Sequence, residues 1–223
     1  MRPVFAAGSF VRLKPIRLAL ALLPAVMLFF VPAARGQFGE PETTPVHDAS
    51  ALKPPAGARV AIVEFADMEC PMCGRENPLL MEAAQKYHIP WIRHDFPLPY
   101  HAWSYQAAIN ARYFDTISKA LGDEYRNYIF ANQISIETRP QMSVWTRSFA
   151  AAHKIALPFA IDPMGKLAQQ VDADRALGEK IGINHTPTIW IVANAPHVPP
   201  YTEVVDPNKL FQVIDQVMAA AHK

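Results

Sequence analysis

A chain of 223 residues with 21 basic and 20 acidic side chains has a formal net charge of only +1. This balance, without a long basic run, argues against nucleic acid as a partner. The length suffices for one domain with a substantial core, or for one domain that carries an insertion.

Residues 1–36 have the organisation of a secretory signal peptide. Four basic residues precede an apolar run from Leu18 to Val31, and small residues follow it up to Gly36. The run is shorter than the ~20 residues of a membrane span, and Pro24 interrupts it. We expect a periplasmic or secreted protein after cleavage behind Gly36, with an uncleaved N-terminal anchor as the alternative. Cleavage removes five basic and no acidic residues, so the net charge falls from +1 to −4.

The next segments predict a lead-in followed by a β-α-β unit. Residues 37–57 are rich in proline and threonine without hydrophobic periodicity, which indicates a flexible lead-in. Residues 58–100 form the first half of the fold. The continuous apolar run at 59–65 predicts a buried central strand. A helix at 70–88 and a second, parallel strand at 89–98 complete the unit.

An all-helical segment then separates this unit from a second sheet-bearing half. Residues 101–160 carry apolar side chains at helical spacing, whereas residues 161–223 return to a mixture of helices and strands. This order indicates one α/β fold split by a helical insertion. The expected elements are helices at 102–121, 123–133, 139–156 and 163–181, strands within 183–193 and at 202–206, and a closing helix at 207–223.

The chain has two cysteines, Cys70 and Cys73, at the start of the predicted helix that follows the buried strand. A helix N-terminus favours negative charge, so it lowers the pKa of a thiol and raises the fraction of reactive thiolate. Positions i and i+3 lie close enough for a disulfide to form after a small relaxation. We expect an exposed nucleophile, Cys70, and a more buried resolving thiol, Cys73. Pro71 and Met72 form the turn between them.

Two other interpretations of the thiol pair compete with redox chemistry. A static disulfide that closes so short a loop gains little chain entropy. A zinc site usually needs four protein ligands, and the chain has no second CxxC motif. A copper or zinc carrier that uses Cys70, Cys73 and His185 is the remaining alternative. In the redox interpretation the cysteine pair is itself the redox group, so no metal, nucleotide or flavin cofactor is expected.

Three stretches, VEFADMECPMC, RHDFPLPYH and INHTPTIWIV, resemble the DsbA-like branch of the thioredoxin superfamily over residues 58–223. The members of this branch are exported thiol–disulfide oxidoreductases. The resemblance implies a thioredoxin fold with an inserted all-helical subdomain. It also implies a cis peptide bond between Thr186 and Pro187, beside which a substrate segment pairs. Glu64 is then expected beneath the resolving thiol, buried with a raised pKa, as its proton relay. The alternative for the Thr186–Pro187 peptide bond is an ordinary trans bond. The alternative for Glu64 is a side chain that reaches solvent at the end of the strand.

The residues around the nucleophile lead us to expect a mild oxidant. Glu69 directly precedes Cys70 and Asp67 is close, and anionic neighbours raise the pKa of a thiol. The Pro71–Met72 dipeptide supplies no histidine to stabilise the thiolate. His185 either offsets these acids by reaching Cys70 or is a solvated loop histidine.

We expect the protein to be an exported protein thiol–disulfide oxidoreductase. The expected direction of the reaction is oxidation of the substrate, which is disulfide donation. The expected partners are unfolded or partly folded exported proteins and a membrane protein that recycles the thiols. Reduction and isomerisation use the same residues, so the direction of the reaction stays open.

Overall fold

In residues 43–221, which the computed structural model describes, four strands form one sheet in the order β2-β1-β3-β4. β1 lies parallel to β2 and antiparallel to β3, and β3 lies antiparallel to β4. The predicted parallel pairing of the first two strands is therefore correct. The predicted signal peptide, residues 1–36, lies outside the described residues. The strands are β1 (Val60–Ala66), β2 (Trp91–Asp95), β3 (Thr188–Ala193) and β4 (Tyr201–Glu203).

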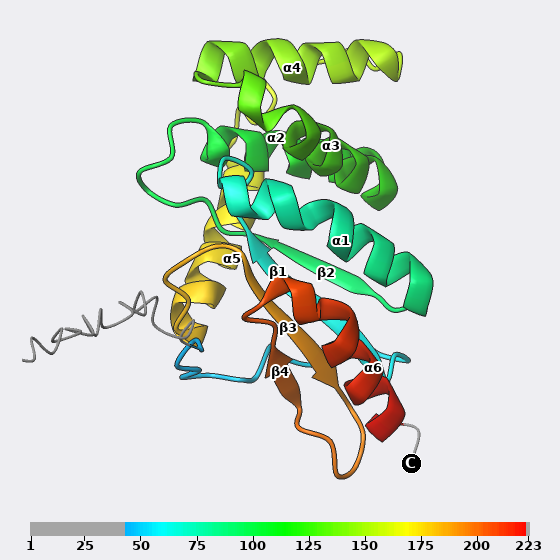
Figure 1. The fold of residues 1–223 in the computed structure, drawn as a ribbon. Coiled ribbons are helices and arrows are strands. Elements are labelled where there is room, and N and C mark those ends of the chain that lie inside the picture. The colour runs from blue at the N-terminus through cyan, green and yellow to red at the C-terminus, as the bar shows by residue number, and fades with distance from the viewer. Residues whose placement is uncertain (1–42, 222–223) are drawn as a thin grey trace, which may run out of the picture. The chain divides into compact units, whose positions relative to one another are not determined.

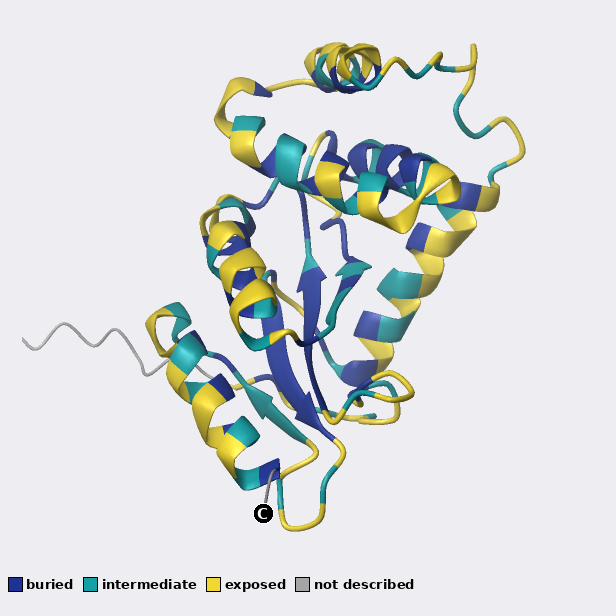
Figure 2. Cartoon of the chain, turned by 90° about the vertical axis from the view of Figure 1, so that its right-hand side faces the viewer, coloured by how far each residue is buried: buried dark blue, intermediate teal, exposed yellow. Residues whose placement is uncertain are grey.

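Helices cover both faces of this sheet, which explains why β1 is apolar on both sides (Figures 1 and 2). Val60 and Ile62 pack into the core shared with α1 and α6, whereas Ala61, Val63 and Phe65 pack into the core shared with α5. Successive side chains of a strand point to opposite faces, so a central strand covered on both faces is apolar at most of its positions. The helices are α1 (Pro71–Tyr87), α5 (Lys166–Ile181) and α6 (Leu210–Ala221), the last preceded by the 3-10 helix η2 (Pro207–Lys209).

The helical insertion has a separate apolar core, which lies at one end of the sheet (Figure 1). Phe114, Tyr125 and Phe149 pack against one another there, with ring centroids 4.7 to 5.2 Å apart. Cys70 and Cys73 belong to this same cluster. The thiol pair therefore lies where the sheet-bearing part meets the insertion. The insertion consists of α2 (Ser104–Ile117), α3 (Lys119–Asn132), the 3-10 helix η1 (Gln133–Ser135) and α4 (Arg139–Ala152).

The predicted break between the first two helices of the insertion, at Gly122, is wrong. The chain breaks at Ser118, whose extended backbone precedes α3 and whose Oγ accepts a hydrogen bond from the Leu121 N–H at 3.1 Å. Serine caps helices in this way because its side chain serves an otherwise unpaired N–H group. Gly122 lies inside α3, where a Cβ atom would collide with the Asp115 side chain.

The described part of the expected lead-in, residues 43–57, is attached to the domain rather than free. The backbone N–H and the hydroxyl of Thr44 both donate to the Glu203 carboxylate, each at 2.7 Å. The His47 N–H donates to the carbonyl of Ile181 at 2.7 Å, and Leu52 is buried in the core beneath α5. Hydrophobic periodicity in the sequence cannot reveal such a segment, because only single residues attach it to the domain. No helix within residues 43–221 is both long and apolar enough to span a bilayer.

Candidate active site

The two cysteines lie where β1 leads into α1. Cys70 is the N-cap of α1, with φ −72° and ψ 119°, and Pro71 occupies the first turn, where a missing N–H group costs little. Cys73 lies in that turn, and both cysteines are free thiols. Cys73 is fully buried, and Cys70 is only 6% exposed. The predicted order of exposure is correct, but the nucleophile is not openly exposed, because it packs into the core of the insertion.

The Cys70 thiol is an acid of unusual strength. Its pKa is lowered to about 5, first because the Cys73 thiol donates a hydrogen bond to its sulfur. The backbone N–H groups of Cys73 and Met72 and the side chain of Thr186 lower it further, against the opposing effect of burial. Cys70 is therefore a thiolate at neutral pH.

The Cys73 thiol has the opposite character. Burial raises its pKa well above the ordinary value, and the adjacent Cys70 and the charge of Glu64 raise it further. The Asp67 N–H donates to its sulfur at 3.5 Å. At neutral pH the pair therefore holds one thiolate and one thiol.

The loop before β3 faces this pair. The Thr186–Pro187 peptide bond is cis, and the Cys70 thiol donates to the carbonyl oxygen of Thr186 at 3.2 Å. Among the described residues, the buried hydroxyl of Thr186 has no hydrogen-bond partner while Cys70 is a thiol. A hydrogen bond from the Thr186 side chain to the Cys70 thiolate is one cause of the low pKa of Cys70. His185 is exposed and its Nδ1 pairs with Asn184 at 2.9 Å, so it is a solvated loop histidine.

The pKa of Cys70 is lowered, so Glu69 and Asp67 do not dominate it as the sequence led us to expect. The Glu69 carboxylate accepts hydrogen bonds from the backbone N–H groups of Trp103 and Ser104, at 2.6 and 3.1 Å, where α2 begins. It therefore caps a helix N-terminus. A milder potential than that of the most oxidising relatives stays a prediction, but it no longer rests on these acids.

Asp67 likewise makes hydrogen bonds that hold the fold around the active-site turn. Its carboxylate accepts from the Leu98 N–H at 2.6 Å, from Nδ1 of His101 at 2.7 Å and from the Glu69 N–H at 2.7 Å. Burial raises the pKa of Asp67, which these hydrogen bonds oppose. The carboxylate thus ties the turn before Cys70 to the segment that follows β2.

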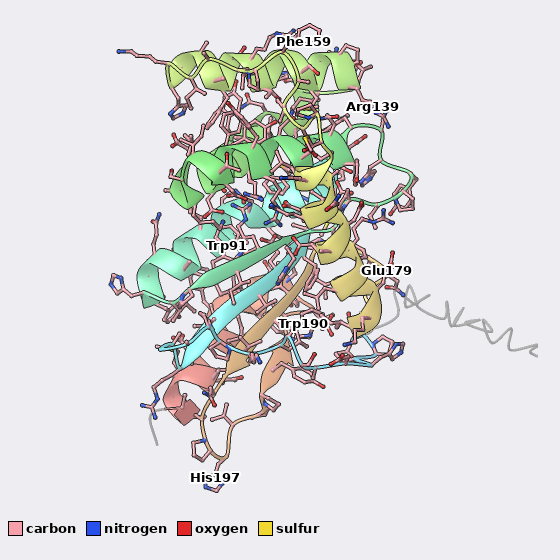
Figure 3. All side chains as sticks on the ribbon, turned by 180° about the vertical axis from the view of Figure 1, so that it is seen from behind. Trp91, Arg139, Phe159, Glu179, Trp190 and His197 are labelled. Carbon is pink, nitrogen blue, oxygen red and sulfur yellow. The ribbon has the colours of Figure 1, made fainter. Side chains whose placement is uncertain are left out.

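Glu64 is fully buried on β1, as expected, and burial raises its pKa. Its Oε2 accepts a hydrogen bond from Nε1 of Trp91 at 3.0 Å and lies 3.8 Å from Nε of Arg93. Figure 3 labels Trp91 on β2. Among the described residues, the second oxygen, Oε1, has no hydrogen-bond partner. Such a carboxyl group is able to exchange a proton, and its relay role stays a prediction.

Two further side chains near the thiols were missed in the sequence. Glu76 is only 6% exposed, and its pKa is raised to about 7 by burial and by the charges of Glu64 and Cys70. Its position three residues after Cys73 on a predicted helix was a usable signal. Gln133 donates hydrogen bonds to the backbone beside Cys70 from the insertion, and no local pattern marks it.

An apolar cavity of about 550 Å³ opens beside the active-site turn. Met72, in that turn, is 39% exposed. Within residues 43–221, no group of three or more His, Cys, Asp and Glu side chains is placed to hold a metal ion. The cavity is lined by side chains from α1 and from the insertion, among them Pro71, Arg75, Trp103, Phe130, Gln133 and Ile134.

A comparison with protein families decides the family of the chain. The family model described as Thioredoxin matches residues 56–203. The chain belongs to the thioredoxin family. Comparison with curated proteins finds no match.

Solved structures share the fold of this thioredoxin-family chain. Alpha-DsbA1 from Wolbachia pipientis has 18% identity and a TM-score of 0.61, over 76% of this chain and 91% of that one. ScsC from Proteus mirabilis has 19% identity and a TM-score of 0.57, over 76% and 74%. A periplasmic thioredoxin-like protein from Salmonella enterica serovar Typhimurium has 18% identity and a TM-score of 0.58, over 74% of this chain and 88% of that one. The predicted thioredoxin fold with a DsbA-like helical insertion is confirmed.

Proposed function

We propose that this chain is an exported protein thiol–disulfide oxidoreductase that acts mainly as a disulfide donor. The observation that carries the proposal is the opposite character of the two thiols. Cys70 has a pKa lowered to about 5, whereas the pKa of Cys73 is raised well above its ordinary value. A thiolate that is stable at neutral pH is a good nucleophile and a good leaving group in disulfide exchange.

The oxidised protein would donate its disulfide in two exchange steps. A substrate thiolate attacks the Cys70 sulfur, which forms a mixed disulfide and releases Cys73 as a thiolate that takes up a proton. A second substrate thiolate then attacks the substrate sulfur of the mixed disulfide and releases Cys70 as a thiolate. Two electrons pass from the substrate dithiol to the cysteine pair. The low pKa of Cys70 stabilises the reduced product and thus favours this direction.

The Thr186–Pro187 loop is the proposed substrate-binding segment, because the Thr186 carbonyl lies 3.2 Å from the Cys70 sulfur. An extended substrate segment is able to pair with such a backbone as an added strand. Export is supported by the signal-peptide organisation of residues 1–36. Unfolded or partly folded exported proteins are then the substrates, and a membrane protein reoxidises the thiols.

Glu64 is the proposed proton relay for Cys73, because both groups are fully buried and the charge of Glu64 raises the pKa of Cys73. When Cys73 resolves a mixed disulfide, the Glu64 carboxylate takes up its proton. We expect Glu64→Gln to slow glutathione release from the Cys70 mixed disulfide by at least about tenfold at pH 7. The variant also loses the inflection that Glu64 adds to the pH profile of that rate.

Stopped-flow measurement of glutathione release between pH 5 and pH 9 checks this expectation. Glu203→Gln is the matched control. Glu203 also accepts hydrogen bonds, two of them from Thr44, but it lies on β4 and not on the strand that carries Glu64. It should leave the profile of the wild type unchanged. An unaltered pH dependence in Glu64→Gln rules out the relay.

The reduction potential of the Cys70–Cys73 pair tests the proposed function. The purified chain is equilibrated in glutathione buffers, and its thiols are trapped and counted. We expect a reversible disulfide with a potential between those of thioredoxin, about −270 mV, and of the strongest oxidants, about −120 mV. A value at the thioredoxin end indicates a reductase or isomerase. Failure to form the disulfide, with tight stoichiometric copper or zinc binding by the reduced chain, favours the metal carrier.

A further inference from the structure

One side chain of the helical insertion reaches the backbone of the active-site turn. Gln133 lies in η1, directly after α3. Its Nε2 donates to the carbonyl oxygen of Met68 at 2.7 Å and to that of Cys70 at 2.9 Å. These contacts cross 65 and 63 positions of the sequence. A single amide group therefore joins the insertion to the segment that ends at the nucleophile.

The surroundings of Gln133 are shaped to receive it. Gly74 lies beside it in α1, and a Cβ atom at that position would come within 2.7 Å of the Gln133 Oε1. Any larger residue at position 74 would displace the amide. Gln133 is half-buried and forms part of the wall of the cavity beside Pro71. The absence of a side chain at Gly74 thus permits the two hydrogen bonds.

The two acceptors lie on either side of Glu69 and bracket the bend that leads to the nucleophile. The Cys70 N–H donates to the carbonyl of Asp67 at 3.0 Å, and the Cys70 carbonyl also accepts from the Gly74 N–H at 3.2 Å. Cys70 keeps the extended N-cap conformation, and the backbone N–H groups of Cys73 and Met72 in the first turn contribute to its low pKa. Rotation of this bend would move the sulfur away from those donors.

We infer that Gln133 is a positioning residue for the thiol pair: its amide holds the bend from Met68 to Cys70 and keeps the Cys70 sulfur in front of the first N–H groups of α1. The inference rests on the proposed function and extends it. It gives the insertion a part in setting the reactivity of the nucleophile, in addition to covering it.

Gln133→Leu tests the inference, because leucine is similar in size and donates no hydrogen bond. We expect the apparent pKa of Cys70 to rise by about one unit, the effect of losing one or two ordinary hydrogen bonds. The equilibrium with glutathione should move about tenfold towards the disulfide form. Alkylation rates between pH 4 and pH 9 and thiol trapping in glutathione buffers measure the two quantities.

Gln133→Glu is a second variant that keeps a polar side chain of the same length. Its carboxylate faces the carbonyl oxygens of Met68 and Cys70 and adds negative charge beside the thiolate, so the pKa should rise by more than in Gln133→Leu. The matched control is Gln106→Leu, because the amide of Gln106 donates to Asn110 at 3.1 Å within α2. The control should titrate like the wild type.

The possible outcomes separate the inference from the proposed function. If the wild type forms a reversible disulfide but both Gln133 variants titrate like it, the positioning role is overturned and the function stands. An equal shift in Gln106→Leu points to general loosening of the insertion and also overturns it. A wild type without a reversible disulfide overturns the proposed function itself.

Discussion

Cys73→Ala is expected to stop disulfide exchange halfway and to retain one glutathione on each chain as a stable mixed disulfide with Cys70. Glutathione disulfide still reacts with the Cys70 thiolate, but no second thiol is present to release the bound half. The pKa of Cys70 should also rise, because the hydrogen bond from the Cys73 thiol is the largest cause of its low value. Mass spectrometry of the non-reduced chain detects the adduct, and assays of ribonuclease refolding should show no oxidase activity.

Cys73→Ser separates the two roles of Cys73. The serine hydroxyl donates a hydrogen bond but forms no disulfide, so this variant also traps glutathione while Cys70 keeps a lower pKa than in Cys73→Ala. Cys70→Ser is the reciprocal control. Its remaining thiol is fully buried with a raised pKa, so alkylation at pH 7 should be slower than in the wild type by at least about a hundredfold. Turnover in Cys73→Ala, or a Cys70→Ser protein that remains an oxidase, contradicts the assignment.

The parts of the fold that the sequence predicts well are those with a local cause. The apolar run of β1, which Glu64 interrupts, follows from helices on both faces of the sheet, and Pro71 marks the start of α1 because it lacks an N–H group. The break between α2 and α3 was misplaced because two signals compete there. Gly122 is a common helix breaker, but here it admits the Asp115 side chain, while Ser118 caps the helix.

The same division applies to the site. Cys70, Cys73 and Glu64 are identified by spacing and by the resemblance, because their proposed roles depend on one strand and one helix. The effect of Glu69 on Cys70 was given too much weight because its hydrogen-bond partner, the N-terminus of α2, lies 34 positions away in sequence. Gln133 is more distant still, and only the folded chain brings it to the thiols. A charge beside a nucleophile in sequence therefore says little until its hydrogen-bond partners are known.

A buried charge network lies at the joint between the insertion and the sheet, at the end of β2. The Asp95 carboxylate accepts two hydrogen bonds from Arg126 of α3, at 3.1 and 2.7 Å, and lies 2.8 Å from Nε of Arg112 of α2. Asp95 and Arg126 are only 5% and 2% exposed. Asp174 of α5 also forms a salt bridge with Arg112, and Asp115 of α2 forms one with Arg126. The network therefore ties β2 to α2, α3 and α5.

Asp95→Asn should lower the free energy of unfolding at pH 7 by about 3 kcal/mol, because it leaves buried guanidinium groups short of a counter-charge. Burial alone raises the pKa of Asp95, but Arg126 and Arg112 outweigh it and hold the pKa at about 2, against an ordinary value of 3.8. A carboxyl group with a lowered pKa stabilises the fold above its unfolded pKa and loses that effect as the pH falls through its folded pKa. The difference between wild type and variant should therefore be constant above about pH 5 and shrink between about pH 4 and pH 2.

Urea denaturation at a series of pH values measures this difference. Glu179→Gln is the matched control, because it removes the same charge from an exposed pair with Arg175, 3.5 Å away on α5. Its effect should stay below about 0.5 kcal/mol. A loss in Asp95→Asn as small as in this control, or one that persists unchanged below about pH 3, would mean that packing joins the insertion to the sheet and that the buried charges add little.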